Sequence, residues 1–129
     1  VKKASADLII NPVVGPEVIT GSTRMKAGTA TKLVLNTLTT GTMIKLGKVY
    51  GNLMVDLRAT SRKLQDRSVR IVRELTGLRQ PAAEKLLARA DGKVKAAIVM
   101  YFRKVDLDDA LAILEQGNQS LRYAIGETP

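Results

Sequence analysis

The sequence predicts a mainly α-helical protein in two parts: residues 1–60 hold one short strand and a long buried helix, and residues 61–129 hold only helices. Three observations predict this class. Residues 27–46 are almost continuously apolar, residues 62–76 show an amphipathic helical pattern, and a helix–turn–helix pattern occurs twice after Pro81. With 129 residues, of which 45% are hydrophobic, the chain is long enough for one ordinary core or two small ones.

The composition excludes several kinds of site. The chain has no cysteine and no histidine, so we expect no disulfide, no metal site, no cofactor and no nucleophile paired with histidine. The longest charge-free apolar run, residues 33–44, is too short to span a bilayer, and a cytoplasmic location is expected. The net charge of +9 attracts phosphate-bearing partners, but with one Phe and three Tyr the chain has few rings for stacking nucleic-acid bases.

The first predicted element is a strand within residues 6–14. Leu8, Ile9 and Ile10 form a short apolar run of the kind found in buried strands, and Asn11-Pro12 ends it. No other run of similar β character follows in the sequence, so this strand has to pair outside the chain or remain unpaired.

A hydroxyl-rich, cationic loop then leads into the long apolar helix. Ser22 or Thr23 is the expected N-cap of this helix, and a break is expected near Gly41 or Gly47. Backbone N–H groups at such a helix start, next to Arg24, form a ready site for a phosphate or a carboxylate. From composition alone, an ordinary capped helix start is the favoured interpretation.

The next stretch leads to a second long helix. Residues 49–57 are interpreted as a loop with a Gly51-Asn52 turn, followed by the start of the next helix. Thr60 or Ser61 is the expected N-cap of a helix over residues 62–76, and Gly77 is its expected end. The arginines of this helix lie largely off its apolar stripe and are interpreted as a solvated surface.

The last third contains a repeat with a 27-residue offset, and each copy is expected to form helix, tight turn and helix. The expected left-handed turn residues are Asp91-Gly92 in the first copy and Gly117-Asn118 in the second. The basic side chains of the repeat are interpreted as solvated. The matching positions are Ala83, Leu86, Leu87, Ala90, Asp91, Val94, Lys95, Ala97 and Ile98 with Ala110, Ile113, Leu114, Gly117, Asn118, Leu121, Arg122, Ala124 and Ile125.

Two long blocks carry a family resemblance. The first reads GPEVITGSTRMKAGTATK and the second LGKVYGNLMVDL. Both blocks, in this order and at this separation, resemble the N-acetylmuramic acid 6-phosphate etherases and the related glucokinase regulatory protein, which contain sugar-isomerase (SIS-type) phosphosugar-binding domains. The likeness extends more loosely to the C-terminus. The first helical hairpin, with the helix before it, also resembles a ubiquitin-associated (UBA-like) module.

The resemblance implies a domain division and a site. Residues 1–60 would be the C-terminal part of a SIS-type domain, and residues 61–129 a UBA-like helical domain. Ser22, Thr23, Arg24 and Lys26 would contact the sugar phosphate, although the loop departs from a P-loop because Ala27 follows Lys26. Glu17, just upstream, is interpreted as a loop or dimer contact.

The implied reaction is cleavage of the lactyl ether of N-acetylmuramic acid 6-phosphate during cell-wall recycling, by a homodimeric lyase. The catalytic glutamates of the family would lie upstream of this chain, so the chain is expected to be a C-terminal part that is inactive alone. Three alternatives stay open: a sugar-phosphate-sensing regulator, a UBA-type interaction module and a helical nucleic-acid-binding module. The last is disfavoured because residues 93–102 are too apolar to read bases.

Overall fold

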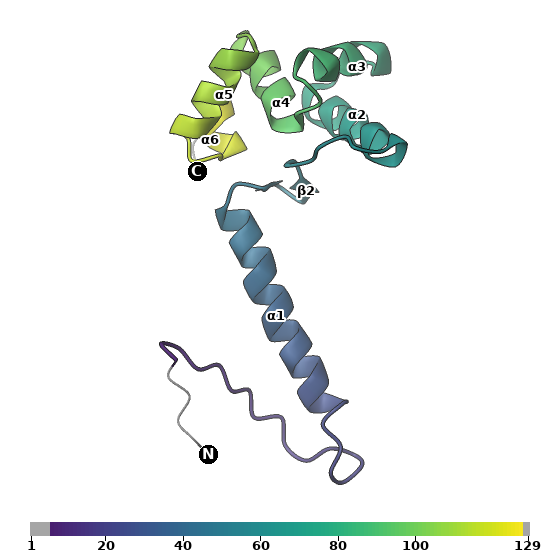
Figure 1. Ribbon diagram of the computed structural model, residues 1–129, viewed down its shortest axis with the longest axis vertical. Helices are drawn as coiled ribbons and strands as arrows, with labels where there is room; N and C mark the ends of the chain where they lie inside the picture. The colour runs from purple at the N-terminus through teal and green to yellow at the C-terminus, as the bar shows by residue number, and fades with distance from the viewer. Residues whose placement is uncertain (1–5, 128–129) are drawn as a thin grey trace. The chain divides into compact units, whose positions relative to one another are not determined.

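The computed structural model describes residues 6–127 (Figure 1). Within that range the chain forms six helices and one two-stranded sheet, so the predicted mainly α class is confirmed. The chain divides into two compact units, and the second begins at Thr42. The elements are α1 (Lys26–Lys45), β1 (Val49–Tyr50), β2 (Leu53–Met54), α2 (Arg62–Thr76), α3 (Gln80–Arg89), α4 (Val94–Arg103), α5 (Leu107–Gln116) and α6 (Leu121–Ile125).

The predicted strand within residues 6–14 does not form. These residues belong to no helix or strand, and the side chains of Leu8, Ile9 and Ile10 are all exposed. A strand is stabilised by hydrogen bonds to a neighbouring strand, and the two strands of the described chain pair only with each other. The apolar run therefore has the composition of a buried strand without the partner that would make it one.

The long apolar segment forms α1 within one residue of its predicted bounds, but the prediction that it is buried is wrong for this chain. No residue of α1 is buried, and Leu33 is 60% exposed. The helix ends as its glycine predicts. Gly47 has a φ of 66°, and the N–H groups of Gly47 and Lys48 donate to the carbonyls of Ile44 and Met43 at 3.0 and 3.1 Å. This is the Schellman arrangement, in which a left-handed glycine lets the last helical carbonyls be satisfied.

A small hairpin replaces the loop predicted within residues 49–57, and the next helix begins only at Arg62, so the helix start predicted there is wrong. Val49 pairs with Met54 and Tyr50 with Leu53 in an antiparallel ladder. The predicted turn at Gly51-Asn52 is confirmed, and Gly51 has a φ of 57°. The strands have two residues each, too short for the alternating pattern that reveals a strand in a sequence.

The helix α2 has the predicted bounds and the predicted caps. The Ser61 side chain accepts a hydrogen bond from the N–H of Leu64, and Gly77 ends the helix in a left-handed conformation. Ile71 and Val72 are buried, whereas the arginines of α2 are exposed, as predicted for a solvated face.

The repeat is visible in the backbone as well as in the sequence. Residues 90 and 117, which end α3 and α5, have nearly the same conformation, with φ of −90° and −84°. In the first turn the left-handed residues are Asp91 and Gly92, as predicted. In the second they are Asn118 and Gln119, so the prediction of Gly117-Asn118 is one residue early. Gly117 is instead the equivalent of Ala90.

The helix α4 lies at the centre of the core, in contact with α2, α3, α5 and α6 (Figure 1). Seven of its ten residues, from Val94 to Met100, are buried. A helix buried on so many sides has little exposed surface with which to contact bases in a DNA groove. This burial also argues against the nucleic-acid-binding alternative. Leu87 and Leu114, the paired leucines of the repeat, both belong to this core.

Candidate functional site

The predicted phosphate contacts lie together at the start of α1. Ser22, Thr23 and Arg24 precede the helix, and Lys26 is its first residue. The Ser22 hydroxyl accepts a hydrogen bond from the N–H of Arg24 at 3.4 Å, within the turn before the helix. Because α1 begins at Lys26, neither Ser22 nor Thr23 stands directly before the helix, and the prediction of a hydroxyl N-cap is wrong.

The cap of α1 is a carboxylate from the other side of the loop. One oxygen of Glu17 accepts from the N–H of Lys26 at 3.0 Å, and the other accepts from the N–H of Ala27 at 3.1 Å. These two backbone hydrogen bonds, that of Lys26 first, hold the pKa of Glu17 below its usual value. The sequence interpretation of Glu17 as a loop contact is confirmed, but the contact it makes was not predicted.

A second contact closes the same loop. The Lys26 ammonium donates to the carbonyl of Pro16 at 2.9 Å. Residues 16 and 17 are thus bound to the first turn of α1, and Ser22, Thr23 and Arg24 lie in the loop between. The Arg24 guanidinium makes no hydrogen bond or ion pair with another residue of the described chain. A hydroxyl pair with an uncommitted guanidinium is suited to gripping a phosphate.

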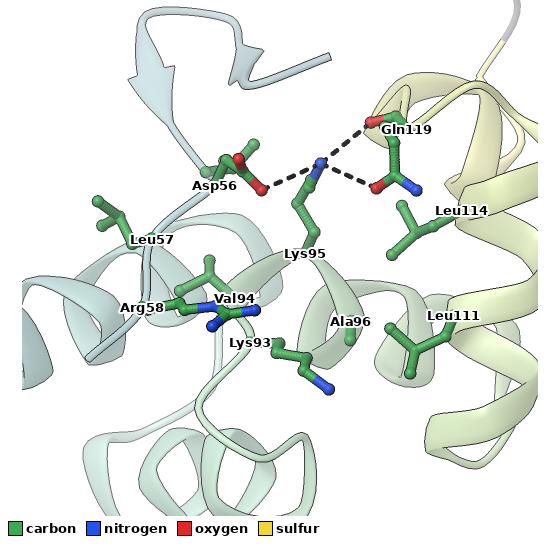
Figure 2. A pocket seen from close by; sticks show the side chains of 11 residues that line it. Asp56, Leu57, Arg58, Lys93, Val94, Lys95, Ala96, Leu111, Leu114 and Gln119 are labelled. Atoms are coloured by element: carbon green, nitrogen blue, oxygen red, sulfur yellow. Dashed lines mark hydrogen bonds and ion pairs between the residues drawn. The ribbon is translucent and has the colours of Figure 1, made fainter. Parts of the chain in front are cut away.

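The second unit holds a buried lysine that sequence reasoning missed. Figure 2 shows the Lys95 ammonium between Asp56, at 3.3 Å, and the side-chain and main-chain oxygens of Gln119, at 3.3 and 3.4 Å. The carbonyl of Gly47 is also within 3.5 Å. Lys95 is only 7% exposed, so its interpretation as a solvated surface residue is wrong. A lysine is buried at low cost only when its charge is paired and its donors are used, as they are here.

Asp56 is held by two lysines. Lys48 lies 3.1 Å from one of its carboxylate oxygens, and Lys95 approaches the other. Burial alone raises the pKa of Asp56, but the hydrogen bond from Lys48 and the positive charge of Lys95 outweigh it, and the pKa lies below its usual value. The cluster ties the segment after α1 to the turn between α5 and α6, which is a structural task.

This cluster forms one wall of a cleft of about 400 Å³. Figure 2 shows Arg58 and Lys93 on the same cleft, together with Leu111 and Leu114 of α5. Lys95 is committed to its partners, and Lys93 lies 3.6 Å from Asp91. Asp56, Lys93 and Lys95 therefore each lie beside an opposite charge, whereas Arg58 forms no ion pair with another residue of the described chain.

Residues 6–127 contain no group of three or more acidic, His or Cys side chains that could hold a metal ion. None of the helices in that range is long and apolar enough to cross a membrane.

Comparison with known proteins gives no matching family model but several closely similar relatives. The chain is 55% identical over 119 residues to N-acetylmuramic acid 6-phosphate etherase of Salinibacter ruber and 54% identical over 121 residues to that of Mycolicibacterium smegmatis. The etherase of Yersinia pestis is 55% identical over 120 residues.

These alignments cover 92–94% of this chain but only 38–41% of each relative. The chain thus spans about two fifths of the length of the relatives that it matches. The resemblance to the N-acetylmuramic acid 6-phosphate etherases is confirmed over almost the whole of this chain, which corresponds to the C-terminal part of these longer proteins.

Proposed function

We propose that this chain is the C-terminal part of an N-acetylmuramic acid 6-phosphate etherase. Such a lyase cleaves the D-lactyl ether of its substrate to give N-acetylglucosamine 6-phosphate and D-lactate, a step of amino sugar catabolism and peptidoglycan recycling. The observation that carries the proposal is the identity of 54–55% with curated etherases along nearly all of the chain.

The reaction needs two acid–base groups, which the resemblance to the etherases places outside this chain. Elimination of lactate requires one group to remove the C2 proton and another to protonate the departing ether oxygen. A general acid works best when its pKa lies near the working pH. Glu17 and Asp56 both have a lowered pKa and are engaged with backbone N–H groups or with lysines. Neither of these two carboxylates suits the role of the general acid, and we propose that the catalytic glutamates lie outside this chain, as the resemblance to the etherases implies.

The proposal is tested by measuring D-lactate release from N-acetylmuramic acid 6-phosphate. The complete protein that carries this sequence should release one lactate per sugar phosphate, whereas residues 1–129 alone should release none. A complete protein that binds the sugar phosphate without releasing lactate would instead support the regulatory alternative.

We further propose that residues 1–60 complete a SIS-type domain and that residues 61–129 form a UBA-like domain. The exposed apolar side chains of α1 support the first part, because a helix of this composition is normally covered by a sheet or by other helices. The mutual contacts of α2, α3 and α4 support a three-helix module for the second.

Within this frame, Ser22, Thr23, Arg24 and Lys26 are proposed to contact the sugar phosphate. Arg24 is the strongest candidate, because its guanidinium is uncommitted within the described chain and suits bidentate contact with a phosphate. Lys26 contributes positive charge next to this contact, although its ammonium is already bonded to Pro16.

Replacement of Arg24 by alanine should weaken binding of N-acetylglucosamine 6-phosphate to the complete protein by about 1.5–3 kcal/mol, the value of a charge-assisted hydrogen bond. Titration calorimetry measures the change. Arg62→Ala, at an exposed arginine of α2 in the second unit, removes the same charge without touching the loop residues and should leave the affinity nearly unchanged. Equal affinity of the wild type, Arg24→Ala and Lys26→Ala would remove the site assignment.

The exposure of α1 leads to a prediction about association. Leu35 and Leu38 are 55% and 50% exposed, and large exposed apolar patches are rare on monomers. We expect residues 1–129 to dimerise or aggregate through this helix, and we propose that the complete protein is a homodimer. Light scattering should show a mass above 14.0 kDa that falls after Leu35→Gln and Leu38→Gln together. A dilution-stable monomer with a cooperative melt would contradict the prediction.

A further inference from the structure

We propose that Glu17 is a positioning residue of the sugar-phosphate site: it occupies the N-terminus of α1 as a resident anion and holds the loop so that Ser22, Thr23 and Arg24 can grip the ligand. The inference rests on the proposed function, because it names how that same site is kept in its binding conformation. It also assigns the ligand contacts to side chains rather than to the first backbone N–H groups of α1.

Glu17 occupies the place at the N-terminus of α1 where a phosphate would otherwise bind. Its two oxygens accept separately from the N–H groups of Lys26 and Ala27, at 3.0 and 3.1 Å. These are the donors that a bound phosphate would use at a helix N-terminus, and the positive end of the helix favours whichever anion lies there. Since a carboxylate of the chain already fills this position, an incoming phosphate has to be bound beside it.

The loop between Glu17 and Lys26 is closed on itself by hydrogen bonds. Lys26 donates to the carbonyl of Pro16, and the N–H of Ser22 donates to the carbonyl of Ile19 at 3.0 Å. The loop turns through Gly21, whose φ of 82° few other residues adopt. Loss of the Glu17 contact would leave the loop held to α1 mainly by the hydrogen bond between Lys26 and Pro16, and the spacing of the three proposed ligand-binding residues would be less well fixed.

The charge of Glu17 distinguishes two explanations of phosphate binding: attraction by the net charge of the loop, and positioning of the loop by Glu17. With Glu17 ionised, Glu17, Arg24 and Lys26 sum to one positive charge, and Glu17 repels a phosphate. If the loop acted only through its charge, neutralising Glu17 should strengthen phosphate binding. If Glu17 positions the loop, the same change should weaken binding although the site becomes more positive.

The test compares Glu17→Gln with Asp7→Asn in the complete protein that carries this sequence, using calorimetry with N-acetylglucosamine 6-phosphate. Both variants remove one negative charge, but Asp7 makes no contact with α1 that the structure records. Glu17→Gln should bind about tenfold more weakly, which corresponds to the loss of roughly one charge-assisted hydrogen bond. Asp7→Asn should bind as the wild type does or slightly more tightly.

A spectroscopic measurement on the same proteins tests the contact without the ligand. The amide signals of Lys26 and Ala27 should shift in the wild type as Glu17 titrates, and this shift should vanish in Glu17→Gln. Unchanged amide signals would overturn the inference, and so would a Glu17→Gln variant that binds the sugar phosphate as well as or better than the wild type. A wild-type protein with intact amide titration that binds no sugar phosphate would overturn the proposed function and, with it, the positioning role.

Discussion

Leu87→Ala and Leu114→Ala are each expected to lower the free energy of unfolding by about 2–5 kcal/mol, the range for removing a buried leucine side chain. Leu87 is 6% exposed and Leu114 is 2% exposed, and they occupy equivalent positions of the two repeats. Both pack in the core that surrounds α4, so each change leaves a cavity that rigid helices on several sides cannot close.

Chemical denaturation followed by circular dichroism measures the change, and the second unit gives the main signal because it holds α2 to α6. Lys85→Ala on α3 and Glu115→Ala on α5 are matched controls, since both side chains are exposed on the same helices. These controls should change stability by no more than about 0.5 kcal/mol. Losses of that small size for both leucine variants would mean that the two hairpins do not share a core.

The parts of the fold that were predicted correctly are those encoded by neighbouring residues. The bounds of α2 follow from Ser61 and Gly77, each of which acts within four residues of its own position. The repeat was visible because equivalent core positions keep the same spacing, and the structure shows the same turn geometry at residues 90 and 117. Local chemistry decides these features, and a single sequence contains it.

The features that were missed depend on residues far apart in the chain. The cap of α1 is supplied by Glu17, nine residues before Lys26, whereas the sequence signal of an N-cap lies in the residue next to the helix. Lys95 is buried because Asp56 and Gln119 meet it from segments 39 and 24 residues away. Nothing in the sequence marks one lysine as buried among so many exposed ones. The prediction that α1 is buried was wrong for a related reason. The apolar composition shows that the helix needs other elements to pack against, but it does not show which elements these are.

Gly47→Ala is expected to destabilise the second unit by about 2–5 kcal/mol, because two costs combine. The first is conformational, since Gly47 has a φ of 66°, where a residue with a Cβ atom is strained. The second is steric. A Cβ atom at this position would lie 2.4 Å from the main-chain oxygen of Gln119, and a backbone atom has no easy way to move. Separation of these segments would also loosen the contacts of Lys95 with Gly47 and Gln119.

Two other glycines separate these costs in the same denaturation experiment. Gly51 has a φ of 57° but nothing within 4 Å of a new Cβ atom, so Gly51→Ala should show the conformational cost alone, about 1–2 kcal/mol. At Gly117 the φ is −84°, so alanine carries no left-handed backbone cost there, and the three atoms nearest to the new Cβ atom all belong to the ring of Tyr123, which would have to move. Gly117→Ala should therefore show a steric cost alone, about 1–3 kcal/mol. If Gly47→Ala costs no more than Gly51→Ala, the end of α1 is not packed against the turn between α5 and α6, and the buried Lys95 cluster cannot have the geometry that the structure gives it.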